Sequence, residues 1–448
     1  MPQDLSALTE ALLDAARAAG ADAADAMAVE GASLSIDVRG GALEQAERSE
    51  GTEVGLRVLL GQRSATVSGS DHRADTLRIM AERAVAMARE APEDPYIGLA
   101  DPGQLARDWD VAALELHDDS PEPAPATLED DARRAEAAAL AVDGIRQIDA
   151  ASASYSARRI HLAATNGFSG GYARSYRSVS CVAIAGSGNG MERDYDGDGR
   201  VFQADLRTPE DIGTRAAQRT LERMNPRRPK TGAYPVLYDE RIAASLIGHL
   251  LSAISGAAVA RGASWLRDAM GDTVLPPALS LTEDPHRPRS MASRPFDAEG
   301  LATQPRQVIA DGVLRGWTLD LANARKLGLQ STANAARSAG SGPGPSAWNI
   351  TLTQGTQSRD DLLREMGTGL VVTSMIGATI NPNTGDYSRG AAGFWVENGA
   401  LAYPVSGVTI AGNLRDMLRS IVSANDARPW LTRVVPSLLV EGLTIAGD

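Results

Sequence analysis

Residues 148–185 read IDAASASYSARRIHLAATNGFSGGYARSYRSVSCVAIA, and this stretch decides the fold class. Its short β-prone runs are broken by Asn166-Gly167 and Gly170-Gly171, dipeptides that are typical of tight turns. Runs joined in this way predict an antiparallel meander. The stretch also holds Cys181, the single cysteine of the chain. Its apolar neighbours favour a buried core residue over a reactive thiol, and one cysteine excludes an internal disulfide.

Segments with helical spacing of apolar residues lie on both sides of this meander. Helices are predicted over residues 5–19, 71–90, 127–142 and 209–224. The first is expected to be capped by Asp4 or Ser6, and the third to begin with a capping box formed by Thr127 and Asp130. Further predictions are strands at 26–38 and 53–67, with a turn at Gly61-Gln62, and an exposed acidic connector at 117–126.

The pattern changes at residues 225–232, where prolines and a glycine stop helices and mark a domain boundary. Beyond it we expect a strand at 235–238, a helix at 240–255 ended by Gly256, hairpins at Asp311-Gly312 and Asn398-Gly399, and helices at 360–366 and 413–423. The fold class is therefore α+β with two domains. Residues 1–228 are expected to form an N-terminal α/β domain on an antiparallel sheet, and residues 229–448 a β-rich C-terminal domain.

The composition limits what the protein can bind. The chain has 448 residues and a formal net charge of −13, which argues against a nucleic-acid surface. No run reaches the roughly 18 apolar residues of a membrane span. The start of the chain, Met1–Ser6, lacks the basic and apolar regions of a signal peptide. The expected location is therefore the cytoplasm.

Residues 194–205, DYDGDGRVFQAD, have the acidic spacing of a calcium loop. Asp194, Asp196 and Asp198 stand at alternating positions before a glycine, and Asp205 takes position 12. A β-prone run precedes the motif where a helix would be expected, and position 12 is Asp instead of the bidentate Glu. A solvated acidic hairpin loop is the favoured interpretation, and a calcium site is the alternative.

The residues give little support to catalysis by this chain alone. There is no G-x-S-x-G motif, and none of the five histidines has another at i+3, i+4 or i+5. His249 lies on the helix 240–255, at the edge between an apolar face and a face of small residues. That small face comprises Ala244, Ser245, Gly248, Ser252 and Ser255. It predicts the close approach of another backbone, and His249 is expected to be packed and hydrogen-bonded.

Several blocks of sequence are typical of one family. They are residues 296–300 (FDAEG), 308–314, 324–328, 369–377 (GLVVTSMIG), 381–390 (NPNTGDYSRG), 393–399 (GFWVENG), 408–414 (VTIAGNL) and 436–442. In the N-terminal half, residues 51–58 (GTEVGLRV) and Asp194-Tyr-Asp196 also fit. By these blocks the chain resembles the PmbA/TldE family over nearly its whole length.

The resemblance implies a zinc metallopeptidase made of two related chains. TldD-type chains have an H-E-x-x-x-H helix and a C-terminal cysteine ligand. TldE-type chains lack these residues and help to enclose the chamber in which extended or unfolded peptides are cut. Roles in maturing a microcin precursor and in degrading an unfolded antitoxin are also implied.

On that pattern Gly248, His249 and Ala253 fall where His, Glu and His would be, and residues 427–436 contain no cysteine. Gly and Ala cannot bind a metal. The resemblance therefore implies a TldE-type subunit with no catalytic residue and no metal of its own. Its partner would be a TldD-type chain that holds the zinc, and the chain alone could form a homodimer.

Two other functions remain open. A homodimeric hydrolase would use His249 with Asp386 or Glu397 in acid–base catalysis, and a binding or scaffold protein would be stabilised by calcium at residues 194–205. The turn 381–390 also has two interpretations. Its polar groups cap their own backbone, or they line a channel or contact the partner, with Asn381, Asp386, Tyr387 and Arg389 as the candidates.

Overall fold

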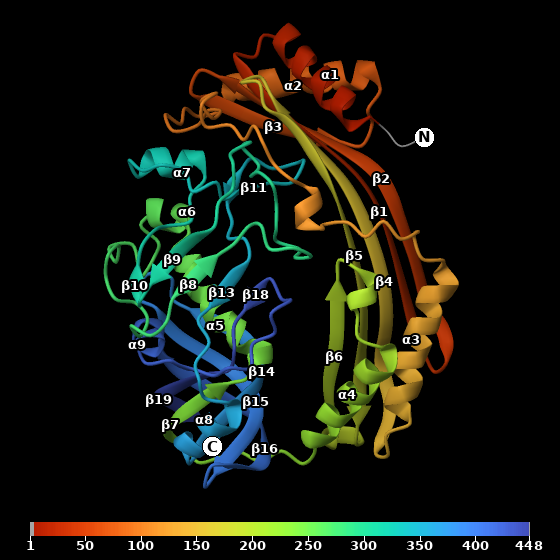
Figure 1. Cartoon of the computed structure of the whole chain (residues 1–448), viewed down its shortest axis with the longest axis vertical. Coiled ribbons are helices and arrows are strands. Elements are labelled where there is room, and N and C mark those ends of the chain that lie inside the picture. Colours follow the sequence, from red (N-terminus) through yellow and green to blue (C-terminus); the bar gives the residue numbers. More distant parts are fainter. Residues whose placement is uncertain (1–3, 448) are drawn as a thin grey trace.

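The computed structural model describes residues 4–447 and shows a mixed α+β fold (Figure 1). The N-terminal half is built on one antiparallel sheet with the strand order β3-β2-β1-β4-β5-β6. Its strands are β1 (Ala23–Arg39), β2 (Ala42–Leu60), β3 (Arg63–Gly69), β4 (Ile145–Ala164), β5 (Ser169–Ala185) and β6 (Glu192–Arg200). The predicted fold class is confirmed.

The strands within residues 148–185 are longer than predicted. They form most of β4 and β5, which pair from Ile145↔Ala185 to Ala163↔Ser169. The turn contains Asn166-Gly167 as expected, but Gly170-Gly171 lies inside β5. Small and polar residues extend these strands because neighbouring strands support them on both sides, which local propensity does not reveal.

Four helices cover one face of this sheet (Figure 1). They are α1 (Leu5–Ala18), α2 (Ala74–Glu90), α3 (Pro125–Leu140) and α4 (Pro209–Glu222). Along β1, Ala26 and Ala28 pack in the core with α1 and α2, and Ile36 packs in the core with α3 and α4. Met27 and Val29 point to the opposite face, because side chains alternate along a strand. That face is turned toward the C-terminal half.

Two of the predicted helix starts have different outcomes. The Asp4 side chain accepts hydrogen bonds from the backbone N–H groups of Ser6 and Ala7, at 3.1 and 3.2 Å, so the first cap is confirmed. The capping box at Thr127 is wrong, because α3 already begins at Pro125 and its N-cap, Ala124, offers no side-chain cap. Proline is favoured at the first helical position, where its missing N–H would be unpaired in any case.

The C-terminal half contains two larger sheets. The five-stranded sheet has β8 (Leu281–Glu283), β9 (Arg306–Ala310), β10 (Val313–Leu314), β13 (Ile350–Leu352) and β18 (Arg433–Val434). The six-stranded sheet has β7 (Gly232–Tyr238), β14 (Gly369–Ile380), β15 (Asp386–Glu397), β16 (Ala400–Asn413), β17 (Val422–Ser423) and β19 (Leu438–Ala446). A short hairpin joins β11 (Ala335–Ala336) to β12 (Gly344–Pro345).

The helices of this half are short except for one. They are α5 (Glu240–Ala253), α6 (Gly256–Ala260), α7 (Leu321–Lys326), α8 (Arg359–Met366) and α9 (Leu414–Arg419). The helix predicted to end at Gly256 ends at Ala253, and Gly256 begins α6. The helix predicted to reach Ser423 ends at Arg419.

The six-stranded sheet closes on itself. Strand β19 pairs with β7 along one edge, and with β16 through Thr409↔Ala446 along the other. The strands β16, β15, β14, β7 and β19 therefore form a ring, and α5 packs in the same core as Tyr238 and Tyr387.

The predicted hairpin turns at Asp311-Gly312 and Asn398-Gly399 are confirmed, and all four residues have positive φ. The pairs β7–β14 and β13–β18 are parallel, so the expected antiparallel pairing is not universal.

The linker 225–232 joins α4 to β7 and separates the first sheet from the rest of the chain. The two-domain division at 228/229 stays a prediction. Within residues 4–447, no helix is long and apolar enough to cross a membrane. Residues 1–3, on which the expected lack of a leader partly depends, lie outside the described residues.

Candidate functional site

Helix α5 is the candidate site, because the ligand positions implied by the family pattern lie on it. It begins at the N-cap Asp239, whose side chain accepts a hydrogen bond from the Arg241 backbone N–H at 3.2 Å. The Ser437 hydroxyl accepts a second one from the Glu240 N–H at 3.0 Å. Leu246, Ile247 and Leu250 are buried, so the apolar face fixes the rotation of the helix.

Two of the three ligand positions offer no donor atom to a metal. Gly248 has no side chain, and Ala253 is buried with a methyl group. The Arg433 Nη1 lies 3.0 Å from the point where a Cβ on residue 248 would stand. A guanidinium thus lies where a ligand side chain would begin. Gly248 and Ala253 do not fit zinc, because neither side chain has a ligand atom. The positive charge of Arg433 beside Gly248 also disfavours a bound cation.

His249 is packed as expected, but the hydrogen bond expected of its ring is not found among the described residues. Its ring contacts that of Tyr387 edge-on, with centroids 5.9 Å apart. Its Nε2 is buried and has no hydrogen-bond partner among the described residues. Burial lowers the pKa of His249, and the positive charge of Arg389 lowers it further. Both effects favour the neutral form of the imidazole.

The surroundings of His249 include residues that the sequence analysis missed. The hydroxyl of Tyr238 donates to that of Tyr387 at 3.4 Å, and the Tyr387 hydroxyl lies 3.7 Å from the Met375 Sδ. Tyr238 ends the strand directly before α5, so its place could have been inferred. Arg433 lies within residues 427–436, and no motif in that stretch places it beside α5.

The predicted close approach of another backbone to the small-residue face is found at Ser255, which forms a β-bridge with Thr318, and not at Gly248. At Gly248 the neighbouring group is the flexible end of Arg433, and Ser245 contacts the Met375 Sδ at 3.9 Å. Ser252 is exposed and donates to the Gly248 carbonyl at 2.9 Å. The face is therefore open to side chains that can move. Among residues 4–447, no group of three His, Cys, Asp or Glu is arranged to hold a metal ion.

The turn 381–390 separates its four candidate residues into two pairs. Asn381 and Asp386 are exposed at the tip: Asn381 accepts from the Asn383 N–H at 3.0 Å, and Asp386 accepts from the Thr384 hydroxyl at 2.7 Å. The Asn381 contact agrees with the interpretation that the turn caps its own backbone, whereas the Thr384–Asp386 contact joins two side chains. Tyr387 is buried against His249, and the Arg389 Nε donates to the Gly377 carbonyl at 2.7 Å.

The acid–base pairs of the hydrolase hypothesis are not brought together. Asp386 is the strand neighbour of Tyr387, so its side chain points to the other face of β15, where Asn413 donates to it at 3.0 Å. Glu397 ends the same strand, about 33 Å from Tyr387 at about 3.3 Å per residue. Neither carboxylate can reach His249, so the structure contradicts both pairings.

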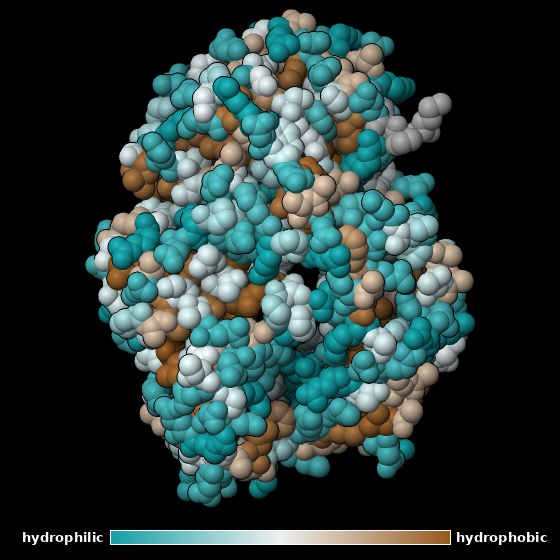
Figure 2. Space-filling model, viewed as in Figure 1, coloured by the Kyte–Doolittle hydropathy of each residue, from teal (hydrophilic) through white to brown (hydrophobic). Residues whose placement is uncertain are grey.

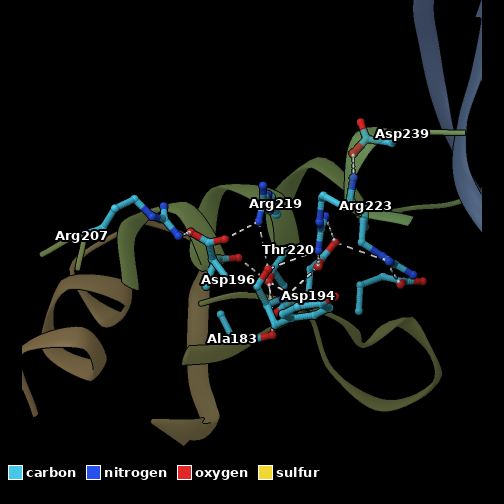
Figure 3. A network of polar contacts seen from close by, with 12 residues as sticks. Ala183, Asp194, Asp196, Arg207, Arg219, Thr220, Arg223 and Asp239 are labelled. Atoms are coloured by element: carbon cyan, nitrogen blue, oxygen red, sulfur yellow. Dashed lines mark hydrogen bonds and ion pairs between the residues drawn. The ribbon is translucent and has the colours of Figure 1, made fainter. Parts of the chain in front are cut away.

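The acidic motif 194–205 is not a solvated hairpin loop. Asp194, Asp196 and Asp198 lie on β6, and the first two are buried (Figure 3). Asp194 accepts from Arg241 of α5 at 2.6 Å, and Asp196 accepts from Arg219 of α4 at 2.6 Å. The wrapped geometry that a calcium loop requires is absent from this strand.

The remaining carboxylates of the motif are also paired with arginines. Asp198 binds Arg200 at 3.0 Å and Asp205 binds Arg289 at 3.0 Å. Burial alone would raise the pKa of Asp194. The hydrogen bond and charge of Arg241, together with the charge of Arg223, outweigh burial and lower the pKa of Asp194. The motif thus anchors α5 to the N-terminal sheet through the Asp194–Arg241 pair.

Models of one family match most of the chain. The PmbA/TldA metallopeptidase domain 1 matches residues 24–88, the central domain residues 118–224, and the C-terminal domain residues 231–447. The chain belongs to the PmbA/TldD family of metalloprotease-like proteins.

Among its relatives, the metalloprotease PmbA of Escherichia coli O157:H7 is 39% identical over 93% of this chain and 90% of its own length. The metalloprotease PmbA homolog of Haemophilus influenzae is 34% identical over 100% of this chain and 97% of its own. The crystal structure of TldE from Thermococcus kodakarensis superposes with a TM-score of 0.86 at 21% identity, covering 98% of this chain and 100% of that one. This last likeness concerns the fold.

Proposed function

We propose that this chain is the TldE-type subunit of a two-chain peptidase, that it pairs with a TldD-type metallopeptidase, and that it does not itself cleave. The observation that carries the proposal is the state of α5. Its ligand positions hold Gly248 and Ala253, and the Arg433 guanidinium stands beside Gly248. A cation at this place repels a metal ion, so the role of the helix in this proposal is structural and not catalytic.

In this proposal the zinc belongs to the partner and the complex acts on extended or unfolded peptides in the cytoplasm. The chain alone can form a homodimer. The membership of the family and the names of its relatives support the peptidase context. Maturation of a microcin-type precursor is the substrate role that the resemblance adds.

The test is to purify this chain with the TldD-type chain of the same organism and to assay both with an unstructured peptide. We expect co-elution and chelator-sensitive cleavage by the pair, and no cleavage by this chain alone. His249→Ala in the pair should change turnover by less than about twofold, because His249 has no carboxylate partner. Robust zinc-dependent cleavage by this chain alone would falsify the proposal.

The exposed tip of the β14–β15 hairpin is our proposed contact with the partner. The backbone N–H groups of Asn383 and Thr384 donate to the Asn381 side chain, and Ile376, four residues before the end of β14, is 76% exposed. The ordered turn and this exposed apolar side chain on the strand that leads to it support a contact here. Asn383→Arg at the tip should weaken co-elution, whereas Gln45→Arg near the exposed β1–β2 hairpin should not. Equal co-elution of both variants would remove the tip from the interface.

A further inference from the structure

A cavity of about 460 Å³ lies between the two halves of the chain. One wall is the face of the N-terminal sheet that carries no helices, with residues of β1, β4 and β5. The other wall comes from the C-terminal half, at residues 291–298 and 337–339. Figure 2 shows the surface hollowed between the two halves. The volume is in the range of sites for small ligands and is sufficient for one or two amino-acid residues.

The cavity is strongly basic although the chain is acidic. Four arginines line it, and the carboxylates are Glu53 and Asp297. The arginines are Arg158, Arg174, Arg294 and Arg337. The Asp297 carboxylate accepts hydrogen bonds from the backbone N–H groups of Glu299, Leu301 and Ala335, at 2.9, 2.9 and 3.1 Å. It is thus already engaged, and burial raises its pKa.

Three of these guanidinium groups have an unused donor. The Nε of Arg174, the Nε of Arg294 and the Nη2 of Arg337 are buried with no hydrogen-bond partner in the described part of the chain. Buried polar atoms are nearly always paired in folded proteins, because an unpaired one costs free energy. All three donors belong to side chains that line one cavity, and none of them has an acceptor among the described residues.

Among these arginines, Arg294 has the fewest partners for its guanidinium. Its guanidinium stacks on the ring of Trp348 at 3.9 Å, and no carboxylate among residues 4–447 pairs with it. Burial lowers its pKa to about 10. By contrast, Arg174 is held by the carbonyls of Met291 and Ser293, and Arg337 by Asp25. Arg294 thus has a buried positive charge without an anionic partner among the described residues. Arg174 and Arg337 are fixed in place and line the same cavity.

Much of the remaining lining is apolar, although serines and Tyr176 also contribute hydroxyl groups. The larger apolar residues include Met27, Val29, Ile160, Leu162, Tyr172 and Phe296. Phe296 packs edge-on against Tyr172, with centroids 5.5 Å apart, and against Phe168 at 4.9 Å. These edge-on contacts hold the rings in place beside the arginines, and the Arg174 guanidinium lies over the Tyr172 ring, 5.0 Å from its centroid. A ligand that fits both surfaces has one anionic end and one apolar group.

We propose that this cavity binds the C-terminal residue of a peptide. The α-carboxylate contacts Arg294, with Arg174 and Arg337 beside it, and the apolar side chain packs on Phe296 and Tyr172. A planar carboxylate matches the paired N–H groups of a guanidinium, which strengthens the interaction. The inference rests on the proposed function in one respect, namely that peptides reach this chain.

The test uses the full chain alone and two acetylated tripeptides that end in phenylalanine, one as the free acid and one as the amide. Calorimetric titration should show the acid binding roughly tenfold or more tightly than the amide, because the amide cannot accept two charge-assisted hydrogen bonds. A free acid ending in serine should bind more weakly than the one ending in phenylalanine. Equal affinities for acid and amide would overturn the proposal.

A variant pair locates the binding. Arg294→Gln should remove the preference for the acid, and the control Arg315→Gln, an exposed arginine outside the cavity, should keep it. If Arg294→Gln is unstable, competition by sulfate decides. Displacement of the acid by sulfate at comparable concentrations, with no effect of the apolar side chain, would show a general anion site and overturn the proposal.

The outcome is separable from that of the proposed function, because the titration needs no partner. If the chain discriminates acid from amide but does not co-elute with the partner, the peptide-binding cavity is supported and the proposed partnership is contradicted. If the pair is active but this chain binds both tripeptides equally, the partnership is supported and the cavity proposal is contradicted.

Discussion

Gly55 on β2 lies directly against the backbone of Ala339, and a Cβ at position 55 would stand 2.6 Å from the Ala339 carbonyl carbon. The two residues belong to different halves of the chain, and Ala339 lines the cavity between those halves. The close approach gives a reason for glycine in the block 51–58. Position 55 must be without a side chain for the segment 337–339 to cover the strand.

Gly55→Ala should therefore separate the two halves locally. We expect a loss of about 2 kcal/mol or more in the free energy of unfolding, because the clash is with backbone and cannot be relieved by a rotamer change. Gly51→Ala on the same strand meets no atom within 4 Å and is the control. Urea denaturation of both variants measures the difference, and similar values for the two would contradict the assigned contact.

Asp25→Asn should destabilise the same junction. The Asp25 carboxylate accepts from the Arg57 Nε at 2.7 Å and also pairs with Arg337, and its side chain is 5% exposed. Removing one partner from a buried ionic group costs about 3–5 kcal/mol, since the remaining charges stay buried. Asp14→Asn, from an exposed pair with Arg17, should cost less than about 1 kcal/mol. A cost of that size for Asp25→Asn as well would argue against a buried network.

The pH dependence of this contribution has a definite sign. Burial would raise the pKa of Asp25, but the charges and hydrogen bonds of Arg57 and Arg337 outweigh it and lower the pKa below 3.8. The contribution is thus present above the ordinary carboxylate pKa and is lost as the pH falls through the lowered value. Acid unfolding of the wild type should show this loss, and Asp25→Asn should not.

Local signals in the sequence identified much of the fold. Asp4 caps α1 by a contact two and three residues away, and Asn398-Gly399 turns a hairpin through its own φ angles. Such features depend on neighbours in the chain, so they can be read from it. The start of α3 was predicted wrongly because Pro125 and the capping-box sequence at Thr127 are both local signals for the beginning of a helix.

The site could be located only in part, because its geometry depends on distant residues. The family pattern identified Gly248, His249 and Ala253. Arg433, which lies beside Gly248, comes from β18 of the five-stranded sheet, far away in the sequence. Asp194 was predicted to be solvated, whereas its partner Arg241 lies 47 residues away and buries it. The unused arginine donors of the cavity have no signature in spacing or composition.

Gly248→Ala should stabilise the protein. A Cβ there meets the mobile end of Arg433 at 3.0 Å, which can move away, and alanine is better than glycine in a helix by about 0.5–1 kcal/mol. Gly256→Ala is the matched contrast, because its Cβ would lie 2.6 Å from Leu319 and 2.9 Å from the Thr318 carbonyl oxygen. Melting temperatures should rise for the first and fall for the second. A fall for both would mean that Arg433 is fixed.

Cys181 should be inert in the folded protein. It is buried with 0% exposure, which confirms the prediction of a core residue, and burial raises its pKa to about 12. The thiolate needed for reaction is therefore scarce and inaccessible at pH 8. Ellman's reagent should react slowly with native protein and at once after unfolding in guanidinium chloride. Because the chain has one cysteine, rapid native reaction would place Cys181 at the surface.

Glu299→Gln should stabilise the protein at neutral and alkaline pH. Burial raises the pKa of Glu299, and the nearby charge of Asp297 raises it further. A folded-state pKa above the unfolded value means that stability is fully present below about pH 4.5 and is lost as the pH rises through the folded value. Glutamine is neutral throughout and can still accept from the Leu321 N–H, which Glu299 does at 2.9 Å. The variant should exceed the wild type by about 1 kcal/mol or more at pH 8, with no difference near pH 4. Exposed Glu44→Gln is the control, and a Glu299→Gln protein weaker than wild type at pH 8 would refute the sign.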